Sequence, residues 1–206
     1  MLILTEGRFG AAVAEIVRPQ VDATVRRLTD VVSDRRAEFL SGARFVAVAL
    51  WRPYDEECDR LDAACWRAGV PWSSAHLTED TLVCGPLAIP GHGPCYGCFR
   101  RRYLTHHRAP ERARCVGRAY AANPDLGPEG FVPAIAWIAA SSLLSDARAP
   151  RADAGRLRLV DLFTGGMVET AVVRVHRCPR CGRRIKQRPG GRFVRQLVPA
   201  VQALLR

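Results

Sequence analysis

Short apolar runs alternate with amphipathic stretches along the first half of the chain. Residues 45–50 are continuously apolar, as in a parallel strand that is buried on both faces. Residues 54–68 predict a helix, because Cys58, Leu61 and Cys65 recur on one face. We also expect strands at 2–5, 23–28, 70–77 and 82–89, and helices between the Gly7–Gly10 turn and Pro19 and over 35–40. This order predicts an α/β fold, with a parallel sheet and right-handed crossovers.

The second half has a different pattern. Residues 131–144 predict an apolar helix, and runs at 157–163 and 168–175 flank Thr164-Gly165-Gly166, which is typical of a β-hairpin. The last segment predicts an amphipathic helix with one apolar face: Phe193, Leu197, Val198, Val201, Leu204 and Leu205. We therefore divide the chain into a Rossmann-like half (1–90), a region with cysteine pairs, helix and hairpin (91–188), and a C-terminal helix (189–206).

Four of the eight cysteines form two C-x-x-C pairs, Cys95 with Cys98 and Cys178 with Cys181. Two such pairs supply the four thiolates of a closed tetrahedral zinc site, with no position left for substrate. Glycines and prolines around both pairs permit the tight turns that this requires. The sequence therefore predicts structural Zn²⁺ at these four residues. Two redox-active pairs and four unrelated thiols are the alternatives.

The other cysteines need no catalytic role. Cys58 and Cys65 fall on the buried face of a predicted helix and Cys84 falls in a predicted strand, where thiols act as small apolar groups. Cys115 lies among arginines, and nothing near it in sequence marks it as a nucleophile.

The formal charge of +11 comes almost entirely from arginine, since Lys186 is the only lysine. Charge by itself indicates nonspecific association, so it gives little support to nucleic-acid binding. We expect arginines near the cysteine pairs to offset the thiolate charge by N–H contacts to sulfur: Arg100, Arg101, Arg102, Arg177, Arg180, Arg183 and Arg184. The same basic charge leaves room for an acidic peptide or RNA.

Neither a signal peptide nor a membrane-spanning stretch is evident, so we expect a soluble, cytoplasmic protein.

The turn after the first strand lacks a phosphate-binding fingerprint. Nucleotide-binding turns carry several glycines that let backbone approach phosphate. Residues 5–10 keep only Gly7 and Gly10, and Glu6 places negative charge where phosphate would lie. We therefore expect no nucleotide at this turn, and we assign no catalytic or cofactor-binding residues.

A strand and helix, then AGVPW, then LVCGPLAIPGHGPCYGCFRRR, and finally a hairpin into HRCPRCG resemble the ThiF-like, ubiquitin-activating-type superfamily. The branch it most resembles holds the inactive partners of azole-forming cyclodehydratases, which make thiazole- and oxazole-modified peptides. The resemblance covers about residues 1–185 and carries over only the four cysteines.

In such systems a YcaO-type partner uses ATP to activate the amide, and the ThiF-like partner delivers the precursor peptide. The resemblance thus implies a noncatalytic scaffold subunit that binds a precursor peptide and a YcaO-type or ThiF-like partner, or a second copy of itself. Trp137 and Ile138 would anchor that interface, unless their helix only covers the chain's own sheet. No leader-binding winged helix precedes the first strand, so we expect another subunit to supply one or this chain to serve assembly alone. An active adenylating or sulfur-transfer enzyme and a zinc-ribbon nucleic-acid binder remain as alternatives.

Overall fold

The computed structural model describes residues 1–33, 37–107, 109–128, 130–149 and 151–182. The predicted C-terminal helix at 189–206 lies outside the described residues. Among those residues, no helix is both long and apolar enough to cross a membrane.

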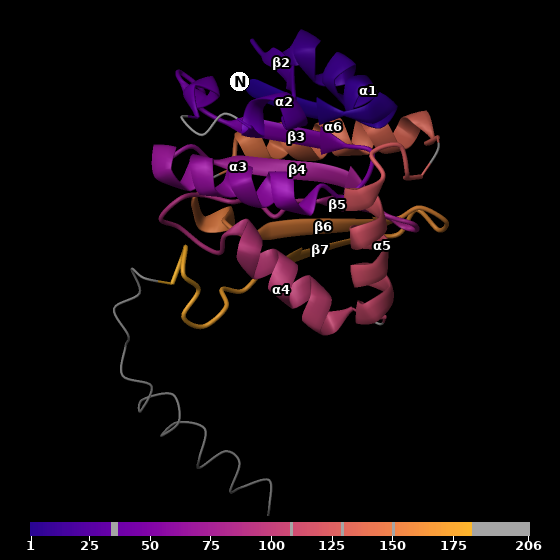
Figure 1. The fold of residues 1–206 in the computed structure, drawn as a ribbon. Coiled ribbons are helices and arrows are strands. Elements are labelled where there is room, and N and C mark those ends of the chain that lie inside the picture. The colour runs from indigo at the N-terminus through magenta and orange to yellow at the C-terminus, as the bar shows by residue number, and fades with distance from the viewer. Residues whose placement is uncertain (34–36, 108, 129, 150, 183–206) are drawn as a thin grey trace, which may run out of the picture.

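A single mixed sheet of seven strands, in the order β2-β1-β3-β4-β5-β6-β7, forms the centre of the fold (Figure 1). Its strands are β1 (Leu2–Glu6), β2 (Thr24–Arg27), β3 (Val46–Leu50), β4 (Trp72–Leu77), β5 (Thr81–Cys84), β6 (Arg156–Asp161) and β7 (Met167–Ala171). The first four strands are parallel and confirm the predicted Rossmann-like half. The hairpin predicted around Gly165 is also present, as β6 and β7.

The remaining pairs are antiparallel; the β6–β7 hairpin was predicted, whereas the antiparallel pairing of β5 with β4 and β6 was not. β5 pairs antiparallel with β4, because residues 78–80 between them make a tight turn, whereas a parallel partner needs a crossover of a dozen or more residues. β5 also ends earlier than predicted, at Cys84. Beyond it, Ala88 meets Trp72 only in an isolated bridge. The parallel half of the sheet therefore ends at β4, and β5 joins it to the predicted hairpin.

Helices cover both faces of the sheet (Figure 1). One face packs against α1 (Gly7–Val17) and α6 (Pro133–Ala147), and the other against α2 (Leu28–Val32), α3 (Asp55–Ala68) and α4 (Tyr96–His106). A further helix, α5 (Pro110–Ala122), contacts α4. Short 3₁₀ turns lie at Arg18–Gln20, Glu38–Leu40 and Arg151–Asp153. Each sheet face thus has its own apolar core.

Several helices differ from the sequence prediction. α1 begins directly at Gly7, without an intervening turn, because a φ of +69° at Gly7 reverses the chain within one residue. The helix predicted at 35–40 is a 3₁₀ turn at Glu38–Leu40 among the described residues. α2, α4 and α5 were not predicted. The helices α3 and α6 agree with the predictions at 54–68 and 131–144.

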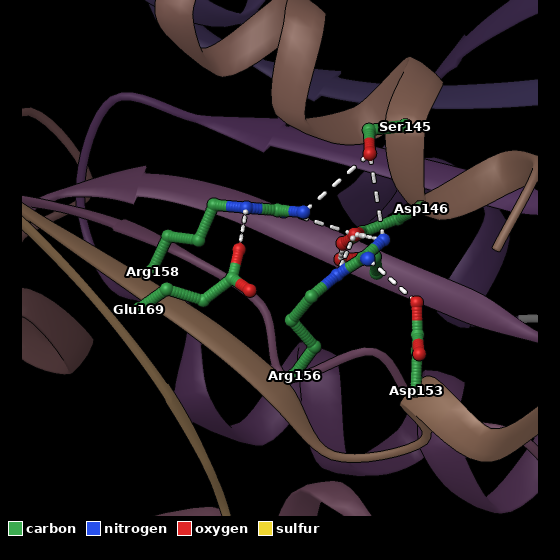
Figure 2. A network of polar contacts seen from close by, with 7 residues as sticks. Ser145, Asp146, Asp153, Arg156, Arg158 and Glu169 are labelled. Atoms are coloured by element: carbon green, nitrogen blue, oxygen red, sulfur yellow. Dashed lines mark hydrogen bonds and ion pairs between the residues drawn. The ribbon is translucent and has the colours of Figure 1, made fainter.

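A buried polar network joins α6 to the antiparallel half of the sheet (Figure 2). The guanidinium groups of Arg156 and Arg158 both donate to Asp146 Oδ1, at 2.7 Å and 3.0 Å. Ser73 of β4 donates to the other carboxylate oxygen of Asp146 at 2.6 Å, and Glu169 of β7 accepts from Arg158 at 2.8 Å. Because Asp146 is 3% exposed, one buried carboxylate fixes the position of α6 against β4 and β6, and Arg158 extends the network to β7.

Candidate metal centre

Cys95, Cys98, Cys178 and Cys181 come together in one buried cluster, with all four sulfurs within 4.8 Å of one another. The Sγ–Sγ distances are 3.8 Å for Cys95–Cys98, 3.5 Å for Cys95–Cys178 and 3.3 Å for Cys98–Cys181. All four thiols are free, so these distances do not reflect disulfides. The four cysteines singled out from the sequence could therefore hold a metal ion together.

The first pair lies at the start of α4. Cys95 is the extended residue before the helix, and Cys98 falls in the first helical turn, where its N–H bonds to the Cys95 carbonyl at 3.0 Å. This half-extended, half-helical geometry turns both sulfurs toward the same point. The helix start thus positions the first two donors.

The second pair lies in a tight turn after β7. The N–H of Cys178 bonds to the Val175 carbonyl at 3.2 Å, and the N–H of Gly182 bonds to the Cys178 carbonyl at 2.8 Å. A Cβ on Gly182 would lie 2.6 Å from the Cys178 backbone, so only glycine fits at this place. The N–H of Val175 also donates to the sulfur of Cys98 at 3.3 Å, which links the two turns.

The donor set fits a tetrahedral metal. Metal–sulfur bonds of about 2.3 Å in a tetrahedron place the sulfurs about 3.8 Å apart, close to the distances described above. Thiol hydrogen bonds from Cys181 and Cys95 hold the pKa of Cys98 well below its usual range, and the thiols of Cys181 and Cys98 raise the pKa of Cys95. A bound cation would replace these shared protons and stabilise thiolates at all four positions.

A buried carboxylate supports both cysteine turns from the side. Asp62 of α3, 1% exposed, accepts from Arg180 Nη1 at 2.5 Å, from Trp72 Nε1 at 3.0 Å and from the N–H of Tyr96 at 3.2 Å. Arg180 lies between Cys178 and Cys181, and Tyr96 follows Cys95. Asp62 therefore connects the second turn, the start of α4 and the central sheet.

Three of the arginines near the cluster do not act as the sequence suggested, and Arg183 and Arg184 lie outside the described residues. Arg180 pairs with Asp62 and Asp59, and Arg100 pairs with Asp55 at 3.2 Å. Arg102 donates to the carbonyls of Val173 and Arg174. Among the described residues, the sulfur of Cys98 instead accepts a hydrogen bond from the backbone N–H of Val175. Nearby carboxylates and carbonyls attract these guanidinium groups more strongly than a distant thiol does.

The other cysteines lie where the sequence placed them. Cys58, Cys65 and Cys84 are buried, and desolvation raises the pKa of Cys84 to about 12. Cys115 is exposed on α5, where Arg118 donates to its sulfur at 3.1 Å. The histidines near the pairs are not part of the sulfur cluster.

The carboxyl edge of the parallel strands is the usual ligand site of such a sheet, at the point where strand order reverses between β1 and β3. Here the Trp51 indole packs against Gly7, and a Cβ on Gly7 would lie 2.5 Å from it. A Cβ on Gly127 would also lie 2.5 Å from the same ring. Trp51 thus fills the space beside the first turn of α1.

Glu6 at this edge is buried, and its carboxylate points toward β2 and α2. It accepts the N–H of Thr29 at 2.9 Å and the Thr29 hydroxyl at 2.7 Å, and it pairs with Arg27 at 3.3 Å. The expectation that Glu6 projects its charge into a phosphate position was therefore wrong. The Glu6 charge is instead balanced by Arg27 and by hydrogen bonds from Thr29.

Arg52 follows Trp51 and is 4% exposed. Its guanidinium carbon lies 4.4 Å from the centre of the Tyr54 ring and 4.9 Å from that of Tyr120, and Nη2 donates to the Pro124 carbonyl at 3.3 Å. Among the described residues, its Nε has no hydrogen-bond partner. Arg52 thereby ties α5 and the chain after it to the end of β3. This contact could not be predicted from the sequence, because Tyr120 is distant from Arg52 along the chain.

Comparison with solved structures finds this fold in heterocyclases and in a microcin C7 biosynthetic enzyme. The heterocyclase TruD superposes with a TM-score of 0.59 at 19% identity, over 88% of this chain and 27% of that one. A heterocyclase in complex with substrate and cofactor gives 0.61 at 13% identity, over 88% and 25%. The microcin C7 biosynthetic enzyme MccB in complex with N-formylated MccA gives 0.57 at 15% identity, over 88% and 67%.

At these identities the likeness establishes the fold that the two kinds of enzyme share with this chain. The chain spans about a quarter of the length of the heterocyclases. No protein-family model matches the sequence, and no curated protein matches it either. The family resemblance predicted from the sequence agrees with these structural neighbours.

Proposed function

We propose that this chain is a noncatalytic, zinc-stabilised partner subunit of a cyclodehydratase that forms azolines in a ribosomal peptide. In this role it helps present the precursor peptide to a YcaO-type, ATP-dependent partner. The fold shared with TruD and with MccB bound to MccA supports a role in peptide modification. Zinc is the proposed metal because it favours four-cysteine tetrahedral sites, which are closed to substrate and structural.

The observation that carries the noncatalytic part is the packing of Trp51 on Gly7. Nucleotide binding at a doubly wound sheet needs backbone N–H groups of the first turn to face phosphate across open space. The indole occupies the space beside that turn, as the contacts with Gly7 and Gly127 describe. The buried Glu6 carboxylate beside this turn already accepts two hydrogen bonds from Thr29, so it is not available to a ligand.

The assembly part rests on the outer face of α6. Ala136, Ala139 and Leu143 are buried against the chain's own sheet, so α6 does cover that sheet, whereas Trp137 is 57% exposed. Large aromatic side chains dominate interface energetics. We propose that Trp137 contacts a YcaO-type or ThiF-like subunit, or a second copy of this chain. Ile138 is partly buried against the apolar core beneath α6, so we expect it to contribute less than Trp137 to such an interface.

An adenylating enzyme is the second candidate, because MccB in complex with ATP has the same fold, with a TM-score of 0.55 over 88% of this chain. An ATP–pyrophosphate exchange assay separates the two. The isolated chain should show no exchange above background with any peptide. It should instead raise azoline formation when it is added to a YcaO-type partner and its precursor. Exchange by the isolated chain that is lost on changing residues 5–10 would establish the adenylating enzyme instead.

A further inference from the structure

A basic groove lies beside the second cysteine turn, away from the carboxyl edge of the parallel strands. It has a volume of about 520 Å³ and runs between α4, α5 and the segment after β7. Its lining contains no acidic residue: Arg101, Arg102, Leu104, Thr105, His106, Arg114, Val175 and His176. The groove therefore presents positive charge beside the two apolar side chains of Leu104 and Val175.

The guanidinium groups of this groove retain unbalanced charge. Arg102 donates to two neutral carbonyls, those of Val173 and Arg174, which fix its position without neutralising it. Among the described residues, no carboxylate pairs with Arg101. Arg114 does pair with Glu111, on the exposed surface of α5. Arg102 is held in place by these two carbonyls, and Arg101 has no described carboxylate partner, so positive charge remains in the groove and favours a carboxylate or phosphate ligand.

The groove continues from an open sheet edge. β7 is the last strand of the sheet, and all five of its residues are exposed. The Gly166 carbonyl accepts from the N–H of Asp161 at one end of this pair of strands, and the N–H of Val172 donates to the Gly155 carbonyl at the other. Alternation therefore turns the backbone N–H and C=O groups of Met167, Glu169 and Ala171 outward. Such an edge pairs readily with another extended chain.

The edge and the groove are separated by a short distance. From Ala171 the chain reaches Val175 of the groove within four residues, or at most about 13 Å of extended backbone. Exposed apolar side chains lie along β7 and the segment after it, with Met167 and Val168 61% exposed and Val173 63% exposed, beside the exposed polar residues Glu169 and Thr170. One extended peptide of about ten residues could contact both parts.

We propose that the β7 edge and the basic groove form one docking site for an extended peptide whose apolar half adds a strand to β7 and whose acidic half enters the groove. The inference rests on the proposed peptide-presenting role and specifies the chemistry of the peptide. A nucleic acid could satisfy the arginines, but it has no amide groups to pair with the strand edge. The peptide is favoured for this reason.

Fluorescence anisotropy with a labelled peptide of about ten residues tests the proposal. The probe alternates threonine and valine in one half and aspartate and glutamate in the other, and both orders of the halves are used. The variant Arg101→Glu/Arg114→Glu should bind about tenfold more weakly at low salt. Arg8→Glu/Arg67→Glu changes the net charge equally at two exposed positions elsewhere and should bind like wild type.

The strand edge is tested separately. Ala171→Pro removes an outward N–H at an edge, where proline is tolerated, and should also weaken binding severalfold. A probe with asparagine and glutamine in its acidic half should lose the effect of the arginine reversal. Equal binding by the two double variants, or no binding of any peptide by wild type, overturns the proposal. Tighter binding of an oligouridylate, unaffected by Ala171→Pro, assigns the groove to nucleic acid.

Azoline formation with a YcaO-type partner distinguishes this inference from the proposed function. Peptide binding without any stimulation of that reaction would refute the subunit role and leave the docking site standing. Full stimulation by Arg101→Glu/Arg114→Glu would retain the subunit role and refute the docking site.

Discussion

Arg180, in the turn between Cys178 and Cys181, donates a hydrogen bond to the buried carboxylate of Asp62, with Nη1 2.5 Å from Oδ2. This pair joins the cysteine cluster to the core of the sheet, because Asp62 also accepts from Trp72 of β4. Asp62→Asn should lower the free energy of unfolding by about 1–3 kcal/mol and weaken metal retention. Asp59→Asn removes an exposed partner of the same arginine and should cost under about 1 kcal/mol. Denaturant unfolding and competition with a chelator measure both effects, and equal losses in the two variants would refute this role of Asp62.

The cysteine cluster should contain one zinc ion per chain. Cys178→Ser should lose the metal and several kcal/mol of stability, or fail to fold, because structural zinc binding contributes directly to folding. Cys115→Ser changes an exposed thiol outside the cluster and should stay within about 0.5 kcal/mol of wild type. Metal analysis of folded, reduced protein is the measurement. A stable wild-type chain without metal would rule out the zinc site.

His76 should make the fold sensitive to mild acid. Burial lowers its pKa to about 4, from an ordinary value near 6.5 in the unfolded chain. Protons therefore bind the unfolded state more strongly, so this contribution to stability is complete above about pH 6.5 and decreases as the pH falls toward 4. At pH 5 the expected loss is about 2 kcal/mol relative to pH 8. Urea unfolding across this range should show a smaller loss in His76→Gln, and an identical pH profile in the variant would contradict the assignment.

Asp146 should be among the most costly polar positions to change. Asp146→Ala leaves Arg156 and Arg158 without their shared carboxylate in a site where their side chains are 15% and 9% exposed. Breaking a buried ion pair on one side costs about 3–5 kcal/mol. Arg60→Ala breaks the exposed pair with Glu56 and should cost under about 1 kcal/mol. If thermal unfolding gives similar values for both variants, the network contributes little to holding α6.

Trp137 should matter for assembly and little for folding, since it is exposed on α6. Trp137→Glu should abolish co-purification with a partner subunit, or dissociate a homodimer, while the far-ultraviolet circular dichroism stays unchanged. Arg67→Glu on α3, across the sheet, is the matched control. A wild-type chain that stays monomeric with its partner proteins present would argue against the interface.

The sequence predicted the parallel strands and α3 well because their signals are local. The run at 45–50 is apolar throughout, and β3 is correspondingly buried on both faces. α3 begins with acids and ends at Gly69, as the pattern indicated. The cysteine pairs were equally readable, since the C-x-x-C spacing itself positions two donors. The division at residue 90 stays a prediction.

Features that depend on distant residues could not be read in this way. α5 has no buried residue, and its position depends on the contact of Tyr120 with Arg52, which lies far away in the sequence. The antiparallel pairing of β5 was missed because pairing partners are set by turn length as well as by strand pattern. Asp62 stood on an otherwise apolar helix face, and such an isolated acid is the one signal that could have revealed its role.

Trp51 is held from two sides by residues that have no side chain, Gly7 of α1 and Gly127 after α5. Any attempt to engineer nucleotide binding into this sheet would therefore begin by removing an indole and would leave a void against both glycines. Refilling that void from either glycine is blocked while Trp51 remains, since a single added carbon would collide with the ring.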